Sequence, residues 1–388
     1  MKTVVTPSSA GMDEAALARV GAAVQEDIGA GRHYGASILI ARGGNIVYRQ
    51  VLGSVAAGRP AADDDRYLLM SMSKAYTAAL VLRAIDHGRF GLDTRVTELV
   101  PGFEVAGKAR ATVRQLLNHT AGLPFGLVPP PLTFDQVGDL PGKVAAINAL
   151  PAVYTPGTRC IYTSGLGFDL LGQILVNTDS QGRGFRQIVH DDLFVPLGMS
   201  DSSFGAPLND PRRVPVSFTP QNTRPTTPAI LHMFNQVFDA DAEVPSGNAY
   251  STVDDVFRFT EALRGRGTAN GHRLISPALY DYSHQNHTGD LVNEAVTFET
   301  EARGLEPMRA NYTLLGGYVR GTGHMLTTAG QTASPDAITA VGGASTGWMI
   351  DPRRDVTVIF LSAGFNEGLS HLIRLQRIND LALAAVND

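Results

Sequence analysis

Segments with the pattern of β-strands stand near both ends of this chain, and a long stretch of mostly helical periodicity separates them. Toward the N-terminus, the apolar runs 36–41 and 45–51 flank a turn that contains two glycines. Toward the C-terminus, residues 346–350 and 355–361 flank a turn at 351–354. We therefore predict one antiparallel sheet assembled from both termini, with a helical region inserted between its two halves.

Helical spacing over residues 13–29 and from about 370 to 385 predicts helices that flank this sheet. With 388 residues, the chain exceeds the usual size of a single core, so two domains or one elaborated domain are expected. The predicted fold class is α/β (α+β), with residues 1–66 and 310–388 forming a discontinuous sheet domain. Residues 67–309 are expected to form a mostly helical domain with loops that cover a cleft.

A serine and a lysine three residues apart, Ser71 and Lys74, stand inside an apolar stretch at the start of a predicted helix. Residues three apart share a helix face, so the Ser71 hydroxyl and the Lys74 amine can meet while Ser73 is rotated away. A hydroxyl is a poor nucleophile at neutral pH and needs a nearby base. Taken alone, the pattern favours an ordinary amphipathic helix. The motifs that follow it favour a serine nucleophile with its own lysine.

Further motifs follow Ser71 in a set order. They are Leu116–Leu123 (LLNHTAGL), Tyr162–Ser164 (YTS), Pro196–Met199 (PLGM) and Val341–Gly343 (VGG). From about residue 10 to the C-terminus, the chain resembles the serine β-lactamase and penicillin-binding-protein superfamily. It is most similar to the class C β-lactamase-like branch that includes family VIII carboxylesterases. The resemblance implies a β-lactamase-like fold, an acyl-enzyme and no cofactor.

The resemblance assigns a role to each motif. In this family the tyrosine of Tyr-x-Asn or Tyr-x-Ser lies beside the lysine, so Lys74 and Tyr162 are both candidate bases for Ser71. The expected oxyanion donors are the backbone N–H groups of Ser71 and Ala344. Four more residues are expected to bind substrate: Ser164, Val341, Gly342 and Gly343.

Val341 departs from the family pattern. Penicillin-recognising members have Lys-Thr-Gly here, and esterase-like members often begin with His or Trp, whereas this chain has Val341-Gly342-Gly343. A substrate carboxylate therefore loses its expected anchor, which argues against β-lactams and D-Ala-D-Ala peptides. Arg320, in the strand-like segment 317–320, is a candidate replacement for the missing cation. The favoured interpretation, however, is that Arg320 is an ordinary strand residue whose side chain lies in solvent.

Two other residues are possible nucleophiles. Ser345 completes the pattern Gly-x-Ser-x-Gly, which in an α/β-hydrolase must follow a strand and start a helix. Here the next residues look like a strand, and only residues 346–388 remain for the Asp, the His and the missing βα units. Cys160 has no Cys-His pattern, and as the single cysteine it forms no internal disulfide. We predict that neither residue is the nucleophile.

Several classes of partner are disfavoured. His284 and His287 have no third ligand nearby, so no metal site is expected, and His119 is interpreted as a hydrogen-bonded scaffold residue. A net charge of −5 without a long basic run argues against nucleic acid and anionic membranes. Neither an apolar leader nor a membrane span is evident, so the expected compartment is the cytoplasm. The oligomeric state stays open.

These observations favour a cofactor-independent serine hydrolase that forms an acyl-enzyme. Its expected substrate, and its expected binding partner, is a small neutral ester. Acyl transfer to a small-molecule acceptor, and amide or β-lactam hydrolysis, are alternatives with the same chemistry. A catalytically silent binding module is the non-enzymatic alternative. The long segments 124–140, 205–245 and 284–325 predict either an apolar pocket wall or ordinary loop packing. Their aromatic residues are Phe125, Phe134, Phe218, Phe234, Phe238 and Tyr312.

Overall fold

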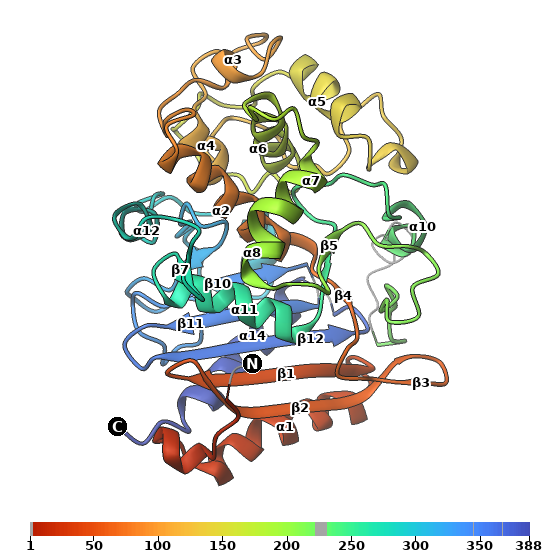
Figure 1. The fold of residues 1–388 in the computed structure, drawn as a ribbon, viewed down its shortest axis with the longest axis vertical. Helices are drawn as coiled ribbons and strands as arrows, with labels where there is room; N and C mark the ends of the chain where they lie inside the picture. Colours follow the sequence, from red (N-terminus) through yellow and green to blue (C-terminus); the bar gives the residue numbers. More distant parts are fainter. Residues whose placement is uncertain (1–2, 222–230, 344, 367) are drawn as a thin grey trace.

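Strands from both ends of the chain form one seven-stranded sheet in the order β3-β2-β1-β12-β11-β10-β9, as the computed structural model shows (Figure 1). The structure describes residues 3–221, 231–343, 345–366 and 368–388. Each neighbouring pair of strands is antiparallel, as the sequence predicts. The strands are β1 (Gly35–Arg42), β2 (Asn45–Ala56), β3 (Arg59–Pro60), β9 (Tyr318–Val319), β10 (Ile338–Gly342), β11 (Thr346–Asp351) and β12 (Val356–Ala363).

The two ends of the chain meet at the centre of the sheet. β1 pairs with β12 over its whole length, from Gly35 opposite Ala363 to Arg42 opposite Val356. Figure 1 shows this junction as the red β1 beside the blue β12. Side chains alternate between the two faces of a strand, and every residue of both strands except Arg42 is buried, so each face must be covered.

Two helices cover one face, α1 (Glu14–Gly29) and α14 (Gly368–Leu383). Leu17 and Val20 of α1 pack in one cluster with Ile38 and Ile40 of β1, together with residues of α14. Asp13 caps α1, because its carboxylate accepts the Ala16 N–H at 2.7 Å. The helices predicted at 13–29 and 370–385 are confirmed within two residues.

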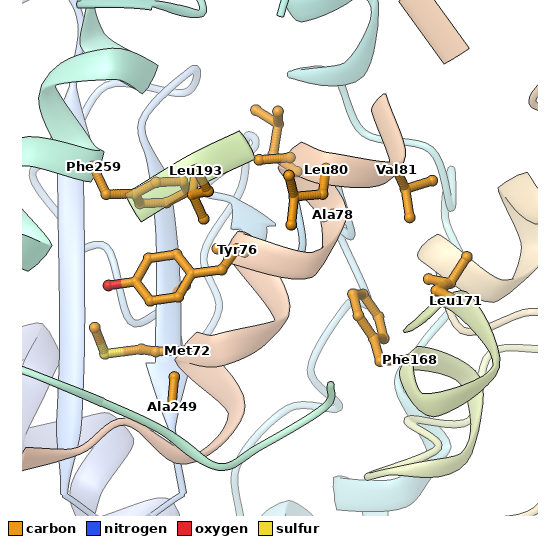
Figure 2. Close-up of a cluster of buried hydrophobic side chains, with 14 of the residues drawn as sticks. Met72, Tyr76, Ala78, Leu80, Val81, Phe168, Leu171, Leu193, Ala249 and Phe259 are labelled. Atoms are coloured by element: carbon orange, nitrogen blue, oxygen red, sulfur yellow. The ribbon is translucent and has the colours of Figure 1, made fainter. Parts of the chain in front are cut away.

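The opposite face of the sheet packs against the helical region, with α2 (Ser73–Asp86) and α11 (Val253–Arg264) nearest to it. Eleven of the fourteen residues of α2 are buried, so α2 is a central helix and the amphipathic interpretation is wrong. Figure 2 shows Tyr76 of α2 facing Phe259 of α11, with Phe168 on the other side of α2. The Tyr76 and Phe259 rings meet edge to face with centroids 4.7 Å apart. This packing fixes the start of α2 in place.

The rest of the helical region consists of shorter elements, many of them above the sheet in Figure 1. Its helices are α3 (Val96–Leu99), α4 (Val113–Leu117), α5 (Leu140–Ala149), α6 (Leu166–Asn177), α7 (Phe185–Val189), α8 (Val195–Leu197), α10 (Phe234–Val237), α12 (Pro277–Ser283) and α13 (Glu294–Glu301). Single turns are η1 (Pro7–Ala10), η2 (Met70–Met72), η3 (Phe134–Gln136) and the π-helical η4 (His190–Phe194). Two small sheets join β4 (Tyr67–Leu68), β5 (Ser203–Phe204) and β6 (Ala249–Ser251), and β7 (Thr268–Ala269) with β8 (His272–Arg273). The division into two domains stays a prediction.

Within the described ranges, every helix is too short or too polar to cross a lipid bilayer.

Candidate active site

Ser71 lies in the 3₁₀ turn η2, which leads directly into α2. The residue before it, Met70, has a φ of 48°, in the left-handed region that is uncommon for residues other than glycine. Leu69 is held from two sides, because its N–H donates to Ala249 O at 2.8 Å and its carbonyl accepts from Thr346 Oγ1 at 3.0 Å. The half-buried Ser71 hydroxyl is therefore presented on a firmly anchored turn.

Lys74 reaches back from the first turn of α2 to Ser71. Its Nζ donates to Ser71 Oγ at 3.0 Å and to the Ser246 carbonyl at 2.9 Å. The side chain is only 2% exposed, and Nζ lies 5.0 Å from the centre of the Tyr162 ring. The meeting of Ser71 and Lys74 that the three-residue spacing predicts is present in the structure.

Tyr162 approaches Ser71 from the loop before α6, and its hydroxyl donates to Ser71 Oγ. The Tyr162 backbone N–H donates to Asn293 Oδ1 at 3.3 Å, and its ring stacks on Tyr312 with centroids 6.4 Å apart. Ser71 Oγ thus has two donors, an amine and a phenol. Either group becomes an acceptor for the serine proton only after it has lost a proton itself, so the arrangement offers two alternative bases.

His119 packs against the rings of both Tyr162 and Tyr312, with ring centroids 4.7 Å and 4.5 Å apart. Its Nδ1 accepts the Thr163 N–H at 3.3 Å, which requires that nitrogen to be unprotonated. Burial, with a contribution from the Lys74 charge, holds the pKa of His119 well below its usual value. His119 is therefore a neutral scaffold residue, as the sequence interpretation has it.

The glycines of the motif Val341–Gly343 lie against the residues that precede Ser71, Leu69 and Met70. A Cβ on Gly342 would lie 2.0 Å from the Leu69 carbonyl oxygen, so only glycine fits there. A Cβ on Gly343 would lie 3.6 Å from Met70 Cε. Val341 points elsewhere, since strand side chains alternate and it packs with the cluster on the α1 and α14 face. The substrate contacts assigned to these three residues stay predictions.

The remaining residues proposed from the sequence are Ser164, Ala344 and Arg320. Ser164 is half-buried with a φ of 54°, a conformation that the more usual Asn tolerates better. Ala344 lies outside the described residues. Arg320 donates its backbone N–H to Ala337 O at 2.8 Å, and its guanidinium donates to the carbonyls of Gly321 and Gln331.

The backbone position and the carbonyl contacts of Arg320 argue against it as a replacement for the cation that relatives have at the position of Val341. Arg320 lies opposite Ala337, four residues before Val341 along the strand direction of β10. Four residues of strand span about 13 Å. We therefore do not assign the carboxylate-binding role to Arg320.

The two rival nucleophiles are unsuited to that role. Ser345 is followed by the strand β11 rather than by a helix, and it is 1% exposed. His371 Nε2 is hydrogen-bonded to the Thr346 carbonyl at 2.9 Å. Cys160 is fully buried, and burial raises the pKa of its thiol to about 12, so little thiolate exists at neutral pH. The interpretation that neither acts as the nucleophile agrees with the structure.

The histidines considered as metal ligands bind backbone carbonyls. His284 Nε2 lies 2.6 Å from Asp336 O, and His287 Nε2 lies 2.8 Å from Tyr282 O. In the part of the chain that the structure describes, no three His, Cys, Asp or Glu side chains are arranged to bind a metal ion.

The loop aromatics mostly pack against one another. Phe234 and Phe238 are buried and stacked, with centroids 4.3 Å apart, and they belong to a cluster that includes Leu68 and contacts Met70. Phe134 and Phe218 pack on this cluster, Phe125 is 65% exposed, and Tyr312 is buried beside Tyr162. Loop packing therefore describes most of them, and the cluster ends next to the residue that precedes Ser71.

Sequence reasoning missed Ser246 and Asn293, which hold Lys74 and Tyr162 in place, and it named Tyr312 without its contact with Tyr162. Ser246 acts through its backbone carbonyl, which every residue has, so its side chain gives no signal. Asn293 lies 131 positions from Tyr162 in the chain, and only the fold brings the two together.

Comparison with known proteins finds similar sequences and structures. Esterase EstB from Burkholderia gladioli is 29% identical over 290 residues, which are 66% of this chain and 73% of that protein. The structure of EstCE1, described as a hydrolase with promiscuous acyltransferase activity, has a TM-score of 0.75 at 22% identity, covering 96% of this chain and 99% of that one. A family VIII carboxylesterase structure has a TM-score of 0.73 at 21% identity, covering 95% and 98%.

The structural likenesses establish the fold, since their sequence identities are low. The sequence model of the β-lactamase family matches residues 20–383, nearly the whole chain and all three motifs around Ser71. The chain therefore belongs to the β-lactamase family.

Proposed function

We propose that this protein is a serine hydrolase that forms an acyl-enzyme on Ser71 and acts on small neutral carboxylic esters. The observation that carries the proposal is the convergence of Lys74 Nζ and the Tyr162 hydroxyl on Ser71 Oγ. The descriptions of two similar proteins, Esterase EstB and a family VIII carboxylesterase, support ester chemistry.

In the proposed reaction, Ser71 Oγ attacks the ester carbonyl carbon while Lys74 and Tyr162 accept the serine proton. The tetrahedral oxyanion is bound by backbone N–H groups, of which that of Ser71 is one. When the carbon–oxygen bond to the alcohol breaks, the Lys74–Tyr162 pair returns the proton to the departing oxygen. A water molecule, deprotonated by the same pair, then attacks the acyl-enzyme and releases the carboxylic acid and Ser71.

Two features favour neutral substrates. The position that is cationic in penicillin-recognising relatives is Val341, and the guanidinium of Arg320 already donates to the carbonyls of Gly321 and Gln331. An apolar cluster contacts Met70, the residue before the nucleophile. A carboxylate-bearing substrate would therefore lack a charge-assisted contact, which typically contributes about 1.5 to 3 kcal/mol.

The test is a panel of p-nitrophenyl esters of increasing acyl length, measured beside nitrocefin. We expect kcat/KM for the best ester to exceed that for nitrocefin by at least the roughly 10- to 150-fold that one lost ionic contact explains. Nitrocefin hydrolysis as efficient as ester hydrolysis would contradict the substrate assignment. Complete loss of covalent labelling by a fluorophosphonate would instead indicate a silent binding module.

Acyl transfer is the second candidate, because EstCE1 is described as having promiscuous acyltransferase activity. Adding a small alcohol to the ester assay separates the two reactions. Hydrolysis predicts that the free acid stays the main product, whereas transfer predicts that a new ester accumulates.

A further inference from the structure

A buried ion pair joins two helices of the helical region close to the active site. Lys143 of α5 pairs with Asp169 in the first turn of α6, and both side chains are fully buried. Removing two charges from water offsets much of their mutual attraction, so a buried pair contributes less to stability than its contact suggests. Apolar residues of similar size would serve the packing equally well. Stability alone therefore does not explain why this buried ion pair is present.

The second contact of Asp169 supplies an explanation. Asp169 Oδ1 accepts the backbone N–H of Ser246 at 3.1 Å, and Ser246 is 1% exposed. The carbonyl of the same Ser246 accepts the Lys74 amine at 2.9 Å. Asp169 and Lys74 thus bind one residue through its two backbone polar groups.

The neighbours of Ser246 are also held against α2 and α6. Thr77 Oγ1 donates to Pro245 O at 2.7 Å, and Ser73 Oγ accepts the Ala249 N–H at 3.0 Å. A Cβ on Gly172 of α6 would lie 2.2 Å from Pro245 Cγ, so the helix backbone approaches this segment closely. Residues 245–249 thus form a segment that packs along α2 beside Lys74. Asp169 fixes this segment through its hydrogen bond with the Ser246 backbone N–H.

We propose that Asp169, with its charge balanced by Lys143, is a positioning residue for Lys74. It orients the Ser246 carbonyl, which in turn keeps the Lys74 amine within 3.0 Å of Ser71 Oγ. The inference rests on the proposed function, in which Lys74 exchanges a proton with Ser71. Asp169 itself has no contact with Ser71, so it acts on the reaction through the position of Lys74.

The test compares two double variants that both remove the buried charges. Lys143→Met with Asp169→Leu also removes the acceptor for the Ser246 N–H. Lys143→Met with Asp169→Asn keeps an oxygen acceptor at that place. Neither leaves an unpaired buried charge, which would itself destabilise the fold. The measurements are the rate constant for fluorophosphonate labelling of Ser71, kcat and KM for p-nitrophenyl acetate, and the thermal midpoint.

With the Leu substitution, we expect labelling and kcat to fall roughly 10- to 100-fold, the loss typical of a catalytic group displaced by about 1 Å. KM should stay within about threefold, because the substrate contacts are unchanged. The Asn substitution should restore most of the lost rate. Wild-type labelling in the Leu variant, or equal losses in both variants, would overturn the proposal. If the Leu variant unfolds, Lys143→Met with Asp169→Ala replaces it, with the same expected loss.

A matched control lies just past the other end of α6. Asp179 is also buried and pairs with Arg183 at 2.8 Å. Asp179→Asn should lower the thermal midpoint without slowing the labelling of Ser71. If it slows labelling as much as the Leu variant does, general destabilisation explains both results and the proposal fails.

The Lys74→Ala variant separates this inference from the proposed function. If labelling in Lys74→Ala equals that of the wild type, Lys74 is not the base and the proposed mechanism itself is wrong. If Lys74→Ala abolishes labelling while the Leu variant labels normally, only the positioning role of Asp169 is refuted.

Discussion

At the scale of single residues, the proposed chemistry centres on one oxygen atom. Ser71 Oγ accepts from Lys74 and from Tyr162, and the carbonyl of Ser246 holds Lys74 from behind. Ser73, one position before Lys74, has a structural role, because its hydroxyl accepts the Ala249 N–H. The two serines of the motif therefore have different roles. Ser71 is the proposed nucleophile, whereas Ser73 is a buried structural residue.

Ser71→Ala should abolish ester hydrolysis, with a loss on the order of 10³ to 10⁶ in kcat, because only Ser71 has the lysine and the tyrosine on its hydroxyl. Ser345→Ala is the matched control and should retain most activity, since its hydroxyl is buried at the start of β11. Steady-state kinetics with p-nitrophenyl acetate measures both. A dead Ser345→Ala beside an active Ser71→Ala would refute the site.

Lys74→Ala and Tyr162→Phe should each lose most of kcat, and their losses should be strongly non-additive, because both groups serve one proton transfer. Lys74→Arg should fail as well, since a guanidinium stays protonated and cannot accept the serine proton. A double-mutant cycle on kcat measures the coupling. A double variant whose loss equals the product of the single losses would argue against a coupled pair.

The nucleophile and both candidate bases could be named from the sequence, because the three-residue spacing and the motif order are local patterns. The residues that hold these three side chains in place could not be named from the sequence. Asn293 and Asp169 reach the site only through tertiary folding, and Ser246 contributes a backbone atom. The position of Arg320 opposite Ala337 likewise follows from strand register, which no local pattern in the sequence specifies.

At the scale of elements, the position of Ser71 depends on how β10 and β11 pack against η2. Gly342 approaches the Leu69 carbonyl, and Thr346 Oγ1 donates to that carbonyl at 3.0 Å. The strands themselves were predictable, since alternation and turn residues mark 346–350 and 355–361 clearly. Their pairing with β1 follows from topology rather than from any local pattern.

Gly342→Ala tests this packing. The added methyl would lie 2.0 Å from the Leu69 oxygen and from Thr346 Oγ1, so β10 and η2 must separate. We expect kcat to fall roughly 100-fold, as for a catalytic group displaced by about 1 Å. Gly29→Ala is the control, because a Cβ there meets no atom within 4 Å. Equal activity of the two variants would show that η2 does not depend on β10.

At the scale of the whole molecule, buried histidines link stability to pH. Burial, with a contribution from Arg374, lowers the pKa of His33 to about 3, from an ordinary value of 6.5. As pH falls below 6.5, the unfolded chain binds a proton at His33 while the folded protein does not. Stability is therefore lost as pH falls, and the loss continues until the folded protein also protonates near pH 3. His119 and His371, whose pKa values are also lowered, add to this effect.

Between pH 7 and pH 5, His33 alone should cost about 2 kcal/mol of folding free energy. Urea unfolding at the two pH values measures the difference. In His33→Gln the difference should shrink by about that amount. His190→Gln should leave it unchanged, because that side chain is 64% exposed. An unaltered pH dependence in His33→Gln would contradict the assignment.

The pairing of Gly35 with Ala363 also sets the order in which this protein can be completed on the ribosome. At typical translation rates of 5 to 20 residues per second, the hairpin β1–β2 waits roughly 15 to 65 s before its central neighbour β12 is made. During that interval the apolar edge of β1 has no strand beside it and is open to pairing with other nascent chains. The late synthesis of β12 is thus expected to leave the edge of β1 open to aggregation while the chain is being made.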